Sequence, residues 1–312
     1  MKLTDHYPQL KGKNLTFFDI DVYQDTKLYL DPNRVVITDI RYWLLINNFF
    51  AYTLSSLRSK KYDVAINLWK KLWEPNETCL WMSAKNKKNR IYGKWIGEEK
   101  AKLLLSEIRI SKAMLSWLIS DLKDISLFIP GVWPDNISDI TTDILKELLI
   151  EYTLEECIRY KIDTKPFKRR VLSSTMGRTQ KVFNLPFKPN GEPIIFVPKS
   201  FLSSSDRFSN SRIYSEYILS DDKNNFNDYS FLIEERIISK ERFITKKKIK
   251  KHHKEVEYKN KTNKEIVVDK LSKKPRLYSK AKNEEAILYK RELQKYGGSE
   301  KVVRPIKKKR KK

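Results

Sequence analysis

The chain has 312 residues, 40% of them hydrophobic, so it is long enough and apolar enough to bury a sizeable core. Its 64 Lys and Arg against 39 Asp and Glu give a net charge of +25, which favours a polyanionic partner. The chain lacks the roughly 18-residue apolar run of a membrane span and the profile of a secretion signal, and its two cysteines are too few for a disulfide framework. We therefore expect a cytoplasmic protein without a membrane partner.

The charge is concentrated at one end of the chain. Residues 231–312 contain 29 basic and 11 acidic residues, a net of +18, which leaves +7 for the first 230 residues. A strongly basic C-terminal segment attached to a less basic domain is typical of proteins that bind DNA or RNA. Codon bias in an AT-rich genome is the alternative, but it does not explain why the excess lies at one end. A protein partner for the basic extension also stays open.

Hydrophobic spacing predicts the first elements. Residues 15–31 alternate between apolar and polar side chains and predict two short strands joined by a turn. Residues 41–57 and 62–73 carry too many apolar positions for one narrow stripe, so they predict two well-buried helices. Residues 98–122 predict one long helix.

A turn and a basic loop separate these helices. Pro75 sets a turn in residues 74–78, where Glu77 is a candidate acid. The polar segment that follows predicts an exposed loop, whose basic side chains would either contact backbone phosphates or simply be solvated. The residues concerned are Lys85, Lys87, Lys88 and Arg90.

The central stretch, residues 124–160, contains the longest regular pattern. Residues 125–129 predict a buried strand that ends at Pro130 and Gly131. Ser138 or Asp139 then predicts the start of a long helix. Its buried stripe consists of Ile140, Ile144, Leu145, Leu148, Leu149 and Tyr152.

A second face of this helix is acidic. Asp139, Asp143, Glu147, Glu151 and Glu155 stand four apart, and like charges at that spacing repel each other. We expect a group outside the helix, or water, to offset the repulsion.

One interpretation of the acidic face is a metal site. Asp139 and Asp143 would bind Mg²⁺ or Mn²⁺, because hard cations prefer carboxylate oxygens. Glu77 and Asp135 would be further catalytic acids, and Lys199, at a predicted strand end, would stabilise developing negative charge. Under this interpretation, changing Asp139 and Asp143 to Asn should abolish activity and leave the fold intact.

The remaining chain is more basic. Lys168, Arg169 and Arg170 form a cluster after the central helix, and residues 181–198 predict a hairpin with its turn at Pro189, Asn190 and Gly191. Residues 203–230 predict a polar linker. Residues 231–312 predict a basic extension, flexible in part, with a short helix near 283–296. Its lysine run, a candidate nucleic-acid-binding segment, is Lys246, Lys247, Lys248, Lys250 and Lys251.

Several sequence blocks resemble a bacterial family. The blocks are EPNET at residues 74–78, PG at 130–131 with SDITT at 138–142, FDIDVYQDTKLYLDP and IIFVPK, and they span about residues 15–200. The family occurs sporadically between strains, as phage-defence and mobile-element genes do, so the resemblance implies an accessory, defence-type role without an established activity. The family's glycine-rich loop after EPNET is replaced here by KNKKNRIYGKWIG, so functions that depend on those glycines do not carry over.

The sequence as a whole predicts an α+β protein, with a mainly helical body around a small sheet in residues 1–202. Two functions stay open. The first is a metal-dependent nuclease, in which a cation held by the carboxylates activates water. The second is a non-catalytic nucleic-acid-binding subunit of a larger complex. Whether the protein is an enzyme is undecided at this point.

Overall fold

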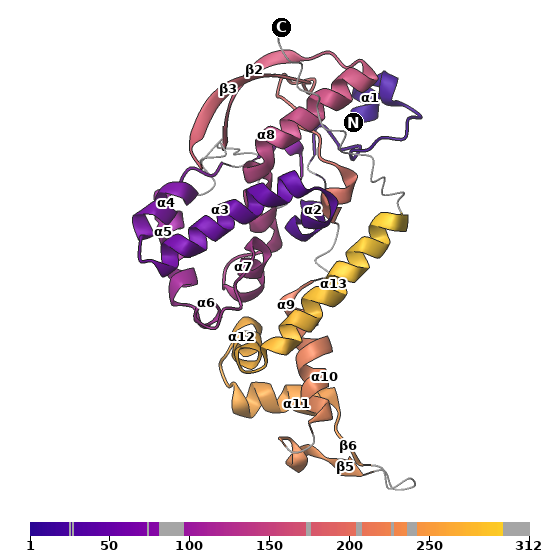
Figure 1. Ribbon diagram of the computed structural model, residues 1–312. Helices are drawn as coiled ribbons and strands as arrows, with labels where there is room; N and C mark the ends of the chain where they lie inside the picture. The colour runs from indigo at the N-terminus through magenta and orange to yellow at the C-terminus, as the bar shows by residue number, and fades with distance from the viewer. Residues whose placement is uncertain are drawn as a thin grey trace.

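The computed structural model describes residues 1–24, 26, 28–73, 75–80, 97–172, 176–203, 208–225, 228–235 and 242–295. Among these residues helices dominate, and three two-stranded antiparallel sheets accompany them, so the fold is α+β with a helical body (Figure 1). Short 3₁₀- or π-helical segments are labelled η. The first elements are α1 (Leu3–His6), η1 (Pro8–Leu10), β1 (Tyr29–Leu30), α2 (Pro32–Thr38), α3 (Ile40–Arg58), α4 (Tyr62–Trp69), η2 (Asn76–Thr78), α5 (Glu98–Ile110), α6 (Lys112–Leu115) and α7 (Leu122–Phe128).

The remaining elements begin with the longest helix. They are α8 (Pro134–Tyr160), β2 (Lys165–Leu172), β3 (Arg178–Leu185), η3 (Lys199–Phe201), β4 (Leu202–Ser203), α9 (Asn210–Arg212), η4 (Ile213–Ile218), α10 (Leu219–Asn224), η5 (Ser230–Leu232), β5 (Glu234–Glu235), β6 (Arg242–Phe243), α11 (Lys246–His252), η6 (His253–Glu257), α12 (Asn263–Lys273) and α13 (Pro275–Lys295).

Helix α8 crosses the centre of the N-terminal part. It begins earlier than the sequence predicts, because Pro134 suits the first helical turn and Asn136 Oδ1 accepts a hydrogen bond from the Trp133 amide at 2.9 Å. The predicted stripe is buried along its length, except that Leu148 is only half-buried. One side of α8 packs against α3 and α7, and another packs against β2 and β3.

Strands β2 and β3 form a hairpin that lies along α8 at one end of the molecule (Figure 1). Arg169 pairs with Lys181 in this register, and Lys168 pairs with Val182. Residues 193–197, predicted as the partner of β3, contribute only the isolated bridge from Pro193 to Phe187 within the described chain. Pro186 and Pro193 lack the N–H groups that a continued ladder needs. The predicted pairing of the hairpin is therefore wrong.

Other predicted elements also differ from the structure. Residues 125–129 belong mostly to helix α7, which is buried on all sides, so its apolar run has no periodicity that distinguishes it from a strand. The predicted helix of residues 98–122 is interrupted at Ser111, whose Oγ caps α6 by accepting from the Met114 amide at 3.1 Å. Among the described residues of 15–31, only Tyr29–Leu30 is a strand, and it pairs with β4.

The described residues of the C-terminal part, 208–225, 228–235 and 242–295, contain several helical segments. Residues 210–224 form helical segments that bury Ile213, Tyr214 and Ile218. Residues 246–257 form α11 and η6. These helices bury Ile249 and His253, so one side of the lysine run packs against the rest of the protein. The predicted short helix near 283–296 is the second half of the longer α13.

Charged groups join the two parts of the chain. Lys123 Nζ lies 2.8 Å from Asp31 Oδ2, and Tyr289 of α13 donates to the same oxygen at 2.6 Å. Lys282, also on α13, pairs with Asp124 at 3.0 Å. Burial, with the neighbouring Asp121 carboxylate, raises the pKa of Asp124 to about 6. The C-terminal helices therefore dock on α2 and α7 through partners buried at the junction.

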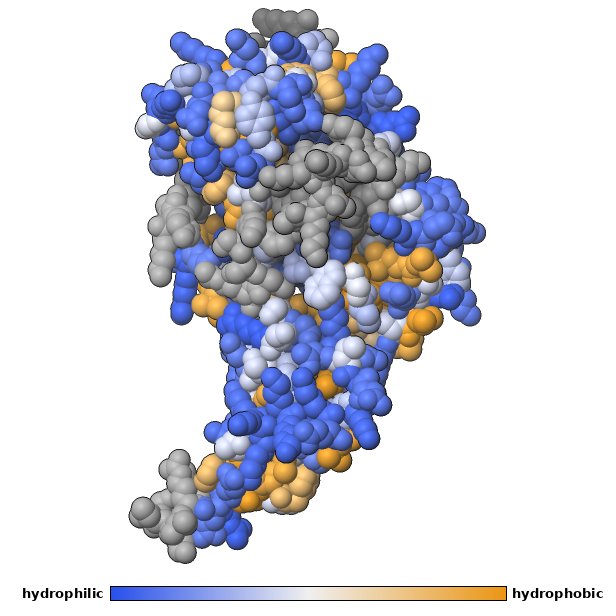
Figure 2. All heavy atoms as spheres, turned by 180° about the vertical axis from the view of Figure 1, so that it is seen from behind, coloured by the Kyte–Doolittle hydropathy of each residue, from blue (hydrophilic) through white to orange (hydrophobic). Residues whose placement is uncertain are grey.

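The surface divides into polar and apolar areas. Figure 2 shows hydrophilic residues over most of the C-terminal helices, whereas apolar residues gather on the flank formed by α4, α5 and α6. Exposed side chains on that flank include Leu103, Ile110 and Leu115. Within the described residues, no helix is both long enough and apolar enough to cross a membrane.

Candidate nucleic-acid interface

Asp143, a predicted metal ligand, lies at the centre of a buried ion cluster. Its Oδ1 lies 2.7 Å from Lys146 Nζ, and its Oδ2 pairs with Arg178 of β3 and accepts from the Trp73 amide at 3.2 Å. The side chain of Asp143 is fully buried, and those of Lys146 and Arg178 are 2% and 7% exposed. Both oxygens of the predicted ligand are therefore occupied by protein donors.

The cluster keeps Asp143 ionised. Burial alone would raise the pKa of this carboxyl, but Lys146 and Arg178 outweigh burial and hold its pKa below the ordinary value. A metal bound at Asp143 would have to displace one of these two buried cations.

The rest of the acidic row faces the same hairpin. Glu147 pairs with Lys181 of β3, one turn of α8 beyond the pair of Asp143 and Arg178. The pKa of Glu151 is raised by burial and then by the neighbouring Glu147. Basic residues of β3 therefore supply much of the compensation that the repulsion along the row requires.

Glu77 also has an arginine partner. It is buried in η2 and pairs with Arg169 of β2, while its backbone carbonyl accepts from the Ile195 amide at 2.9 Å. Glu77 therefore links the hairpin to the segment after it. Glu77 and Asp143 are each bound to a different arginine.

The other predicted site residues lie apart from these pairs. Asp135 is half-buried in the first turn of α8, and Asp139, also half-buried, follows one turn later. Lys199 is exposed in η3, where its amide donates to the Thr16 carbonyl at 2.9 Å. In the part of the chain that the structure describes, no three His, Cys, Asp or Glu side chains are grouped as metal ligands.

The hairpin has a second, outward face. Because side chains alternate along a strand, Lys168 and Arg170 point away from the side that carries Arg169. Both are exposed, as are Gln180 and Val182 opposite them, and neither basic residue has an acidic partner among the described residues. We call Lys168 and Arg170 the outer hairpin face.

The lysine run forms a second basic surface on α11. Lys246 donates to the Ser215 carbonyl at 2.9 Å, Lys248 pairs with Glu234, and Lys251 lies 3.8 Å from Glu255. Lys247 and Lys250 are exposed and have no acidic partner within the described chain. We call Lys247 and Lys250 the α11 lysine face. The predicted phosphate-binding residues of the loop lie outside the described residues: Lys85, Lys87, Lys88 and Arg90.

Two groups of structural residues escaped the sequence interpretation. Arg178 and Lys181 lie on a strand whose partner was predicted wrongly, and they stand three residues apart, a spacing that on a strand gives no signal of a shared face. His253, fully buried, lies 2.8 Å from Tyr229 Oη and 3.3 Å from Asp222 Oδ2. Nothing in the sequence near the His252–His253 pair indicates these partners.

Comparison with protein families matches residues 9–210 to a domain of unknown function (DUF8370). The chain belongs to this family. The DUF8370 domain contains α8, the hairpin and the ion cluster, and it ends where α9 begins. Searches of curated proteins and of solved structures found no significant match.

Proposed function

We propose that this DUF8370 protein binds nucleic acid without cleaving it, through the outer hairpin face and the α11 lysine face. The observation that carries the proposal is the sorting of basic residues on the hairpin. Arg169, Arg178 and Lys181 are bound to carboxylates, whereas Lys168 and Arg170 face solvent. Exposed cations without a protein partner are the ones that can release counterions from phosphates.

The shape of the hairpin agrees with this role. A two-stranded β-ribbon fits the major groove of a duplex, where its outward side chains reach phosphates and base edges. The polar side chain of Gln180 lies opposite Arg170 on the outer face. The α11 lysine face lies toward the other end of the molecule (Figure 1), so the two surfaces should contribute independently.

The non-catalytic role is favoured over the metal-dependent nuclease by the positions of the acids. The two most buried candidates, Asp143 and Glu77, already neutralise Arg178 and Arg169. A cation-binding nuclease site needs carboxylates whose oxygens are available to Mg²⁺ or Mn²⁺. A binding subunit needs only the exposed lysines and arginines, and it suits the defence-type role that the resemblance implies.

The test compares charge reversals on each surface. Lys168→Glu with Arg170→Glu, and separately Lys247→Glu with Lys250→Glu, should weaken binding to labelled DNA and RNA and reduce the slope of log affinity against log salt. Fluorescence anisotropy at several salt concentrations measures both quantities. Lys71→Glu with Lys100→Glu is the matched control, because both lysines are exposed on the α4–α5 side.

Two outcomes of these binding measurements would contradict the proposed surfaces. If both surface variants bind with the wild-type affinity and salt slope, or if the control loses as much as they do, the proposed surfaces are wrong. Incubating the same substrates with Mg²⁺ and with Mn²⁺ tests the nuclease. Cleavage by wild-type protein that Asp139→Asn abolishes would replace the non-catalytic role with the catalytic one.

A further inference from the structure

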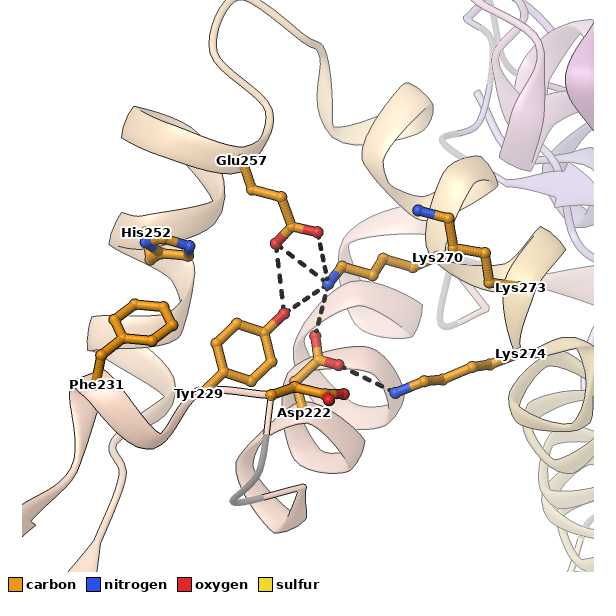
Figure 3. A pocket seen from close by; sticks show the side chains of 9 residues that line it. Asp222, Tyr229, Phe231, His252, Glu257, Lys270, Lys273 and Lys274 are labelled. Atoms are coloured by element: carbon orange, nitrogen blue, oxygen red, sulfur yellow. Dashed lines mark hydrogen bonds and ion pairs between the residues drawn. The ribbon is translucent and has the colours of Figure 1, made fainter.

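A pocket of about 310 Å³ opens in the C-terminal part, between η5, α11, η6 and α12 (Figure 3). This volume is at the small end of the range for small-molecule sites. Residues between positions 222 and 274 line it, among them Asp222, Tyr229, Phe231, His252, Glu257 and Lys270. The pocket lies outside the family match.

The floor of the pocket is charged but internally neutralised. Lys270 Nζ lies 2.6 Å from Tyr229 Oη, 3.1 Å from Glu257 Oε1 and 3.4 Å from Asp222 Oδ2, the arrangement seen in Figure 3. Lys274 lies 3.4 Å from the other Asp222 oxygen. Burial opposes ionisation of Asp222 and Glu257, yet the surrounding cations lower the pKa of both. An anion entering the pocket would therefore meet as many fixed negative groups as positive ones.

One wall of the pocket is aromatic. Phe231 is 63% exposed, and its ring centroid lies 4.9 Å from that of His252 in an edge-to-face arrangement. Figure 3 shows both rings on the same side, with Tyr229 beside them. Since the two rings are not stacked on each other and most of Phe231 is exposed, ring surface of Phe231 is available for stacking.

We propose that this pocket receives an unpaired base of single-stranded nucleic acid, which stacks on Phe231. The inference rests on the proposed function and specifies its ligand. A planar base has the polar edge and the apolar faces that a neutralised polar floor and an aromatic wall can contact, and stacking on aromatic side chains is common to proteins that bind single strands. The α11 lysine face belongs to the same helix as His252 and would contact the phosphates.

The experiment separates bases from phosphates. The probes are a labelled oligonucleotide of about ten thymidines, an abasic oligonucleotide of equal length and charge, and a duplex. Wild-type protein should prefer the thymidine strand to the abasic strand. Phe231→Ala should weaken thymidine-strand binding by about fivefold or more and leave binding to the abasic strand and the duplex unchanged. Phe231→Trp should restore the preference, because it restores a stacking surface.

Leu115→Ala is the matched control, since it also truncates an exposed apolar side chain, but on α6. If Phe231→Ala keeps the preference for the thymidine strand, or weakens all three probes equally, the pocket does not receive a base. Binding of wild-type protein to all three probes in that case would leave the proposed function standing. Failure of wild-type protein to bind any probe would overturn both.

Discussion

The DUF8370 domain carries a smaller excess charge than the C-terminal segment, residues 211–312, although it is about twice as long. Residues 9–210 contain 32 basic and 23 acidic residues, a net of +9, and residues 211–312 contain 31 and 15, a net of +16. In the domain, Arg169 and Arg178 of the hairpin are paired with Glu77 of the EPNET block and Asp143 of α8. In the C-terminal segment, Lys247 and Lys250 of α11 are exposed to solvent. The charged residues of the pocket floor, in contrast, neutralise one another. The comparison teaches that net charge locates a binding surface only after the cations bound to buried carboxylates are set aside.

The strongest way to test the structural role of the acidic row is Asp143→Asn. The substitution leaves Lys146 and Arg178 without their shared counter-charge, so it should reduce the free energy of unfolding by about 3–5 kcal/mol. Urea-induced unfolding measures the change. Glu147→Gln, at the more exposed pair, should cost no more than about 1 kcal/mol. This expectation reverses the one that follows from a metal site, in which the Asn variant keeps a stable fold.

The same variant should alter the dependence of stability on pH. The folded-state pKa of Asp143 lies below its ordinary value, so its contribution is present above the unfolded pKa, near 4, and is lost as pH falls through the folded pKa. Wild-type protein should therefore lose more stability in acid than Asp143→Asn does. If the two proteins lose the same amount of stability as pH falls, Asp143 is not the ionised centre of the cluster.

A smaller effect is expected from the apolar stripe of α8. Ile144 is 1% exposed, and Ile144→Ala should cost about 2–5 kcal/mol, the usual range for a large-to-small change in a core. Leu148 is only half-buried, so Leu148→Ala should cost clearly less. Thermal unfolding of the two variants side by side gives the order. The reverse order would mean that the buried face of α8 is rotated.

These predictions show where sequence patterns were sufficient. Helical spacing correctly predicted the position of α3 and the buried stripe of α8, although α3 is less buried than expected, with Leu44 and Tyr52 exposed. It failed for α7, which is buried on all sides, and for α11, which buries the single apolar residue Ile249 among its lysines. In both cases tertiary burial, which no local window contains, decided the structure.

The candidate site was predictable in part for a related reason. The acidic row itself was visible in the sequence, and so was the need for a compensating group. Its partners were not, because Arg178 and Lys181 approach α8 only once β3 pairs with β2 rather than with residues 193–197. The run of five lysines was also visible in the sequence. Only the fold shows that Lys248 pairs with Glu234 whereas Lys247 is exposed to solvent.

The smallest expected effect gives the sharpest form of the comparison, because it uses two lysines of one hairpin. Lys181 faces α8 and pairs with Glu147, whereas Lys168 lies on the outer hairpin face. Lys168→Ala should weaken binding to DNA and RNA of any sequence about equally and reduce the salt slope by about one, as the loss of one phosphate contact does. Lys181→Ala should leave the salt slope unchanged, because the charge of Lys181 is already paired with Glu147. Anisotropy titrations over a range of salt concentrations compare the two variants. Equal slopes for both would show that the two faces of the hairpin do not differ in their access to phosphate, and the division between bound and available cations would then have to be drawn elsewhere.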